Sequence, residues 1–241
     1  MRRILATVLA ASMGAGIMAC NASASTVIVS PVDAIASTTN GINDLDIGNT
    51  IDHSGLTIDF INGVTDFDSY IALDPYHSSA AAGNEWFSRS YPSLTYTHQT
   101  LWFDLGSIMQ VDRLAFWNEE FAGISGFEMS YSTDNVTFTD IGHFTTTNNP
   151  GATGTAGATQ PYWYLPDVLT FSQVDMRYFS IYTDTCPAAG SLGYWGCSLG
   201  EIAVGAQSAS TVPVPAALPL VISGIGALGL VGWRRRRRPA A

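Results

Sequence analysis

Hydrophobic and polar residues alternate most clearly between Leu101 and Thr139. Short runs there place apolar or aromatic residues at every second position, with Gly, Asp, Asn and Ser between the runs; they cover residues 101–105, 111–117, 127–131 and 136–138. This period of two, rich in β-branched and aromatic residues, is typical of half-buried antiparallel strands, and no helical period of similar strength competes with it. The stretch therefore predicts the core of an all-β sandwich.

Further strands are predicted on both sides of this stretch. They cover residues 26–29 (an edge strand), 140–144, 162–164, 168–171 and 176–182, with weaker strand character at 56–60. Residues 30–48 are polar and predict a loop or extension, and the Gly-, Ala- and Thr-rich residues 148–160 predict a surface loop. Between its two unusual ends the chain has the length of one domain.

The N-terminus has the features of an export signal. Met1-Arg2-Arg3 precedes an uncharged apolar stretch up to Ala19, and Ala22-Ser23-Ala24 forms a small-x-small site. A basic start, an apolar segment and such a site predict a secretory signal peptide over residues 1–24. The alternative to cleavage after Ala24 is lipoprotein processing at Cys20, which follows an imperfect lipobox.

The C-terminus, residues 208–241, combines a short motif, an apolar segment and a basic cluster. Residues 216–233 are uncharged and apolar and are followed by five arginines at 234–238. A helix of this length reaches the lower limit of a bilayer span, and the arginines place the C-terminus in the cytoplasm. The motif preceding the span consists of Val212, Pro213, Val214, Pro215 and Ala216.

This C-terminal pattern resembles the PEP-CTERM family of bacterial sorting signals, in the variant whose motif reads VPLPA. The resemblance implies a Gram-negative host, processing by an exosortase, and a place at the cell surface or in the extracellular polysaccharide matrix. The C-terminal span would anchor the protein in the inner membrane, transiently or permanently.

Charge excludes one class of partner. The body between the two ends carries three arginines, no lysine and all twenty acidic residues, a net charge of −17. Nucleic-acid affinity comes mainly from neutralising phosphates, so we expect no nucleic-acid binding. Such a surface is compatible with cations and with neutral sugars.

Four segments carry motifs of one known family: residues 102–114, 127–138, 171–181 and 200–204. Together they resemble the discoidin family, also called coagulation factor 5/8 type C or galactose-binding-like domains. The resemblance implies a jelly-roll β-sandwich over residues 51–207, preceded by an extension with an edge strand at 25–50. A fifth segment, residues 84–88, resembles the T-x-W-x-S motif of that family, in which Trp86 packs in the core.

Two cysteines of the exported body, Cys186 and Cys197, lie 11 positions apart across a Gly-rich stretch. In an oxidising compartment this arrangement predicts a disulfide.

A structural Ca²⁺ site is implied by the family resemblance. Many discoidin-like domains pair an Asp-containing early loop with the glutamate of the last strand. The corresponding candidates are Asp66, Asp68 and Glu201. Oxygen ligands of this kind suit a hard cation, but solvated acids in a turn remain the alternative.

Sugar-binding candidates lie in two predicted loops. Trp117, Asn118 and Glu119 leave a predicted strand, and Tyr194 and Trp195 lie between the two cysteines. An exposed indole stacks on a pyranose ring while amide and carboxylate groups bind hydroxyls. The alternative is that Trp117 covers the edge of the sheet.

No catalytic motif stands out, since nucleophile-elbow, zinc-protease and phosphate-loop patterns are absent from the sequence. The sequence favours a non-catalytic surface protein that binds or organises extracellular polysaccharide. The alternatives are a structural or adhesive matrix protein without a glycan ligand, and an enzyme acting on exopolysaccharide.

Overall fold

The two predicted strands at residues 101–117 form one long strand in the computed structural model, which describes residues 25–39, 45–78, 83–88, 98–118, 123–146, 163–184 and 196–207. Strands dominate these residues, which confirms the all-β prediction. In chain order the elements are β1 (Thr26–Val29), β2 (Asp33–Ala36), the 3-10 helix η1 (Ile47–Thr50), α1 (Phe67–Ile71), β3 (His77–Ser78), β4 (Trp86–Phe87), β5 (Thr100–Asn118), β6 (Gly126–Ser132), β7 (Thr139–Thr145), β8 (Trp163–Tyr164), β9 (Asp167–Thr183) and β10 (Ser198–Gln207).

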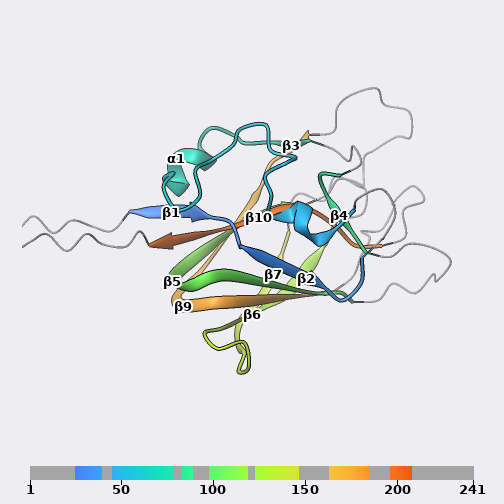
Figure 1. The fold of residues 1–241 in the computed structure, drawn as a ribbon, viewed down its shortest axis with the longest axis vertical. Coiled ribbons are helices and arrows are strands. Elements are labelled where there is room, and N and C mark those ends of the chain that lie inside the picture. Colours follow the sequence, from blue (N-terminus) through green and yellow to red (C-terminus); the bar gives the residue numbers. More distant parts are fainter. Residues whose placement is uncertain are drawn as a thin grey trace, which may run out of the picture.

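Strands β5 and β9 are long because each passes through two halves of one sheet (Figure 1). The first part of β5 pairs with β2 and with the second part of β9, which also pairs with β6; β7 follows at the edge. We call this the open half-sheet. The second part of β5 pairs with β10 and with the first part of β9, and β1 and β4 pair with β10. We call this the covered half-sheet.

The passage from one half-sheet to the other corrects two strand boundaries. The sequence predicts a strand end at Gly106, but β5 continues through it with a positive φ of 80° and a register shift between Asp104 and Met109. The separate strands predicted at 168–171 and 176–182 are likewise one strand, β9. Glycine at Gly106 permits a backbone conformation that other residues rarely adopt, so the strand bends there without ending.

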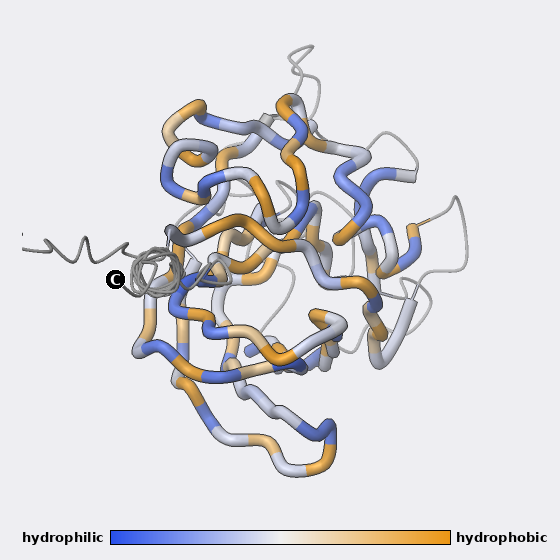
Figure 2. Tube along the Cα trace, turned by 60° about the vertical axis from the view of Figure 1, so that its left-hand side comes forward, coloured by the Kyte–Doolittle hydropathy of each residue, from blue (hydrophilic) through white to orange (hydrophobic). Residues whose placement is uncertain are grey.

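The main core lies between the two half-sheets. Leu101 and Phe103 from one part of β5 and Phe116 from the other are buried in it, as the alternation predicts. Trp86 is also fully buried there, which agrees with its predicted packing role. Figure 2 shows the alternation of hydrophobic and hydrophilic residues along the strands.

A second core lies on the outer face of the covered half-sheet. Residues 51–78, including α1, pack over β1 and β10 (Figure 1). Phe60, Phe67 and Tyr70 of this cover contact the second core, and the Tyr70 hydroxyl donates to the carbonyl of Ile58 at 2.6 Å. We call residues 51–78 the cover. The predicted strand at 56–60 is absent; the structure shows an isolated bridge between Leu56 and His77.

The remaining predictions concern individual strands, a loop and the two ends of the chain. The edge strand at 26–29 is confirmed as β1, whereas β2 lies within residues 30–48, predicted as a loop. Residues 136–138 belong to the β6–β7 turn and not to a strand. Among the described residues, no helix is both long and apolar enough to span a membrane. The predicted signal peptide and C-terminal span lie outside the described residues.

Candidate functional site

Trp117 and Asn118 end β5 inside the protein. Trp117 is 0% exposed, and its indole N–H donates to the carbonyl of Pro75 in the cover at 2.8 Å. Asn118 is also fully buried and bonds both the carbonyl and the N–H of Ile124. Neither side chain has a face free for a sugar, so the predicted binding role is wrong for these two residues.

Several other predicted residues lie outside the described part of the chain. Cys197 is buried and disulfide-bonded, but Cys186 is not described, so their pairing stays a prediction. The same holds for the candidate ligand residues Glu119, Tyr194 and Trp195 and for the sorting motif Val212, Pro213, Val214, Pro215 and Ala216.

The acids predicted to bind Ca²⁺ have other partners. Asp66 is the N-cap of α1, where its carboxylate accepts the backbone N–H of Ser69 at 2.8 Å. Capping satisfies a free donor of the first helical turn. Asp68 forms an ion pair with Arg113 at 2.7 Å. Both carboxylates therefore organise the start of α1.

Glu201 lies too far from these acids to share a cation with them. Asp66 bridges Val27, and Val27 pairs with Ala206 of β10. Glu201 is five residues away along β10, about 17 Å at the usual strand rise. Among the described residues, no group of three or more His, Cys, Asp or Glu side chains could hold a metal ion. The proposed set of Asp66, Asp68 and Glu201 is therefore wrong.

Glu201 is instead an internal residue under the cover. It is 0% exposed, and one carboxyl oxygen accepts the backbone N–H of His53 at 3.1 Å. Burial, and secondarily the negative charge of Asp52, raises the pKa of Glu201 well above its ordinary value. A neutral carboxyl group avoids the large free-energy penalty of a charge buried without a counter-charge.

The outer face of the open half-sheet exposes a second tryptophan. Ile35, Trp102, Ser180 and Ser130 lie side by side in one row across β2, β5, β9 and β6. The two serines are too small to cover the neighbouring indole, and Trp102 is 38% exposed. The row therefore presents a flat aromatic surface beside hydroxyl groups.

The turn between β6 and β7 forms a wall beside this row. Asn135 and Phe138 of the turn both line a groove that includes Trp102. The carboxylate of Asp134 fixes the turn by accepting the backbone N–H groups of Val136 and Thr137 at 2.9 Å each. These bonds to the charged form lower the pKa of Asp134.

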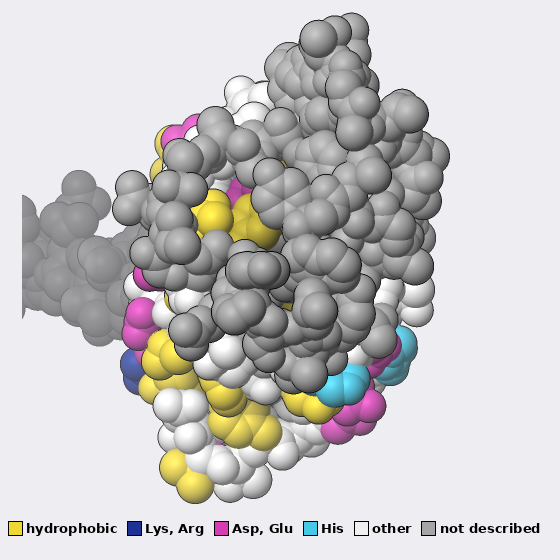
Figure 3. Space-filling view, turned by 90° about the vertical axis from the view of Figure 1, so that its right-hand side faces the viewer, with side chains coloured by type: hydrophobic (Ala, Val, Ile, Leu, Met, Phe, Trp, Pro, Cys, Tyr) yellow, Lys and Arg dark blue, Asp and Glu magenta, His cyan; other side chains and the backbone are white. Residues whose placement is uncertain are grey.

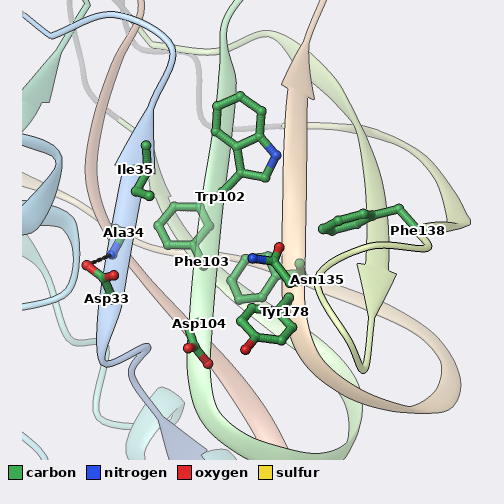
Figure 4. Close-up of a pocket in the computed structure, with 10 residues that line it drawn as sticks. Asp33, Ala34, Ile35, Trp102, Phe103, Asp104, Asn135, Phe138 and Tyr178 are labelled. Carbon is green, nitrogen blue, oxygen red and sulfur yellow. Dashed lines mark hydrogen bonds between the residues drawn. The ribbon is translucent and has the colours of Figure 1, made fainter.

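The groove encloses about 180 Å³ and crosses β2, β5 and β9. Figure 4 shows Trp102 and Phe138 toward one end, and Asp33, Asp104 and Tyr178 toward the other. We call it the Trp102 groove. Its lining residues are Asp33, Ala34, Ile35, Trp102, Phe103, Asp104, Asn135, Phe138, Tyr178 and Phe179.

The acidic end of the Trp102 groove contains one paired carboxylate. Arg177 donates from Nε and Nη2 to the two carboxylate oxygens of Asp104 at 2.9 Å each, and its guanidinium lies 4.8 Å from the ring centre of Tyr178. This bidentate bond is the main reason that the pKa of Asp104 is lowered. Asp104 is therefore held as a carboxylate in a fixed position.

The sequence contained a signal for Trp102. The residue alternates with the buried Leu101 and Phe103, so its outward direction follows from the period of two. The missing information was which outer face the rest of the chain covers. That depends on contacts between segments distant in sequence.

Comparisons with known proteins give structural matches only. No family model matches the chain, and no curated protein matches it. The discoidin and sorting-signal resemblances therefore stay predictions.

Three solved structures illustrate the structural matches. A mutant of chitosan-binding module 1 from a Paenibacillus sp. IK-5 chitosanase/glucanase matches with a TM-score of 0.46 and 18% identity, over 76% of this chain and 99% of the module. CBM32-3 from a family 31 glycoside hydrolase of Clostridium perfringens matches with a TM-score of 0.47 and 11% identity, over 75% of this chain and 91% of that module. The family 32 CBM from Clostridium perfringens NanJ, in complex with galactose, matches with a TM-score of 0.43 and 17% identity. The match covers 75% of this chain and 97% of that module. These TM-scores lie below 0.5, so no ligand is carried over from these modules.

Proposed function

We propose that this chain is a non-catalytic glycan-binding protein and that the Trp102 groove holds the sugar. The observation that carries the proposal is Trp102 itself, a tryptophan 38% exposed on an open sheet face beside two serines. Large aromatic side chains on a surface that nothing covers are typical of binding sites. The apolar face of a sugar ring stacks on such an indole, while its hydroxyls bind nearby polar groups.

The groove supplies those polar groups at its edges. Asn135 offers an amide on one side, and Tyr178 and Asp104 offer oxygen atoms at the acidic end. Phe138, on the other side of β9 from Trp102, gives a second aromatic surface along the groove (Figure 4). A mixture of flat apolar faces and a few fixed polar groups suits an oligosaccharide better than a purely apolar ligand.

The electrostatics of the groove favour binding over hydrolysis. A glycosidase needs one carboxyl group with a raised pKa to protonate the leaving oxygen. Arg177 has the opposite effect on the pKa of Asp104. Glu201 does have a raised pKa, but it is fully buried under the cover of the other half-sheet. An exopolysaccharide-degrading enzyme is therefore the weaker alternative.

The proposal includes the destination of the protein. The basic, apolar N-terminus and the VPVPA motif with its apolar segment and arginine cluster support export and recognition by an exosortase. The glycan would then be a polysaccharide of the bacterial surface or matrix. A structural matrix protein without a glycan ligand is the second candidate.

Glycan binding by the full-length chain tests the proposal. The ligand is first found on a glycan array and by affinity electrophoresis in gels containing extracted matrix polysaccharide. Trp102→Ala is then expected to weaken binding about tenfold or more, because central aromatic contacts dominate many binding sites. Tyr182→Ala is the matched control: Tyr182 is 45% exposed on the same half-sheet but does not line the groove.

Each alternative has its own outcome. Full binding by Trp102→Ala would remove the groove from the proposal, and absence of binding to any glycan would favour the structural matrix protein. Release of reducing ends from the polysaccharide would indicate an enzyme.

A further inference from the structure

Two carboxylates face each other across the acidic end of the Trp102 groove. Asp33 of β2 pairs directly with Asp104 of β5. Like charges in directly opposed positions of adjacent strands are destabilising. Arg177 neutralises Asp104, but the carboxylate of Asp33 accepts only the neighbouring N–H of Ala34 among the hydrogen bonds of the described residues. The groove therefore keeps one negative charge without an ion-pair partner in the described structure.

Positive charge near the groove is already engaged. Of the two arginines in the described residues, Arg177 is bound to Asp104 and Arg113 to Asp68 and Asp112. On the face shown in Figure 3, acidic side chains appear at several places on the described surface, whereas basic side chains, all arginine in this chain, appear at one edge only. A uronate, sulfate or phosphate group would thus meet negative charge in the groove and no available cation among the described side chains.

We infer that the Trp102 groove selects glycans that carry free, protonated amino groups, that is, polymers of unacetylated hexosamine. This inference rests on the glycan-binding function proposed for the groove. Asp33 supplies the unpaired charge for the ammonium group, and Asp104 and the Tyr178 hydroxyl are further acceptors beside it. An ammonium group is also attracted to the face of a tryptophan ring such as that of Trp102.

The spacing of the groove fits a sugar with such a substituent. Trp102 and Asp104 are two residues apart on β5, which separates the stacking surface from the acidic end by about 7 Å. A pyranose ring stacked on Trp102, or its neighbour in the same chain, can therefore place an amino group at the carboxylates. N-acetylation would remove the positive charge and the attraction with it.

Two matched probes test the inference on the full-length chain: a β-linked glucosamine oligomer with free amines, and the same oligomer fully N-acetylated. The wild type is expected to bind the free-amine oligomer more tightly. Asp33→Asn is expected to weaken that binding about two- to fivefold, the range for an exposed ion pair. Its binding of the acetylated oligomer should not change. The loss should shrink in high salt, where exposed charges are screened.

The control is Asp74→Asn, which removes the same charge from an exposed turn at the cover, on the opposite outer face. Equal losses in Asp33→Asn and Asp74→Asn would overturn the inference, because they would show attraction to the net charge of the whole protein. Equal binding of the two oligomers, still sensitive to Trp102→Ala, would also overturn it while leaving glycan binding intact. If Trp102→Ala weakens the binding of neither oligomer nor of any other glycan, the proposed function itself fails.

Discussion

Trp102 and Trp117 lie on the same strand, β5, and both point away from the main core. Trp117 is fully buried, because the cover packs over the outer face of its half-sheet. Trp102 is 38% exposed, because nothing in the described structure covers the corresponding face. The same residue type, pointing outward from the same strand, is therefore a core residue in one half-sheet and partly exposed in the other.

The two outer faces also differ in how they handle polar groups. Under the cover, His77, Glu85 and Glu201 are all 0% exposed. On the open half-sheet, the polar residues beside Trp102 are serines and carboxylates in contact with solvent. Outward side chains of the covered half-sheet are buried and contribute to stability. Outward side chains of the open half-sheet are accessible to a molecule in solution.

The largest expected effect comes from replacing the two tryptophans separately: Trp117→Ala should lower stability, whereas Trp102→Ala should leave stability nearly unchanged. Trp117→Ala is expected to lower the free energy of unfolding by about 3–5 kcal/mol, since it leaves a cavity between β5 and the cover. The carbonyl of Pro75 would also lose its donor. Trp102→Ala should change the free energy of unfolding by less than about 1 kcal/mol, because the side chain of Trp102 is already partly exposed to solvent. Urea unfolding followed by circular dichroism measures both.

A small loss in Trp117→Ala would mean that the cover is not packed on the sheet as described. Trp117→Phe is the graded control: it keeps most of the apolar volume and removes only the bond to Pro75, so its loss should be smaller than that of the alanine variant.

The local features of the fold follow from the sequence. The period of two identified the inward positions of β5, such as Leu101 and Phe103, and the edge strand β1. These features depend on neighbouring residues alone. The outward position of Trp102 was readable in the same way, but its exposure was not.

The non-local features could not be predicted. The cover has no strong pattern of its own, and the residues by which it contacts Trp117, such as Tyr70 and Pro75, lie more than 40 positions away in the sequence. The continuous path of β5 through Gly106 depends on pairing with β9, more than 60 residues later. The prediction for Trp117 was wrong because its burial is set by segments distant in sequence, whereas Trp195 lies outside the described residues.

The polar cluster under the cover should make stability depend on pH. His77 Nδ1 donates to the carbonyl of Ser78 at 2.8 Å, and the Tyr164 hydroxyl, also 2.8 Å from Nδ1, donates to Glu85. The other ring nitrogen, Nε2, lies against Gly55 and has no hydrogen-bond partner among the described residues. A proton there would be a buried donor with no acceptor. Burial accordingly lowers the pKa of His77 to about 4.

The sign of the effect follows from the two pKa values of His77. The unfolded chain protonates near pH 6.5 and the folded one near 4, so the unfolded state binds more protons between these values. The contribution of His77 to stability should be complete above pH 6.5 and fall by about 3 kcal/mol as the pH drops to 4. Urea unfolding across this range measures it.

His77→Asn provides the control, because asparagine can still donate to Ser78 but does not titrate. The raised pKa of Glu201 acts in the opposite direction, with stability lost as the pH rises through it, and it acts in both proteins. The difference between the two pH profiles therefore isolates His77. Parallel profiles would contradict a neutral, buried His77.

The smallest effect concerns Asn135, at the turn that walls the Trp102 groove. Its φ of 59° is a left-handed conformation that asparagine and glycine tolerate. Asn135→Ala should therefore cost about 1 kcal/mol of stability, whereas Asn135→Gly should leave it within a few tenths. Thermal unfolding in matched buffer distinguishes the two.

The same pair of variants tests whether the open half-sheet uses Asn135 for binding. Both remove the amide, but only glycine keeps the turn, which Ser132 and Asp134 hold through backbone N–H bonds. If the amide contacts the glycan, Asn135→Gly should weaken binding about two- to tenfold with no loss of stability, the range for one neutral hydrogen bond. Unchanged binding by the glycine variant, with weaker binding by the alanine variant, would limit Asn135 to positioning Phe138. On the proposed function, a substitution on the open face such as Asn135→Gly changes affinity without changing stability, whereas Trp117→Ala under the cover changes stability.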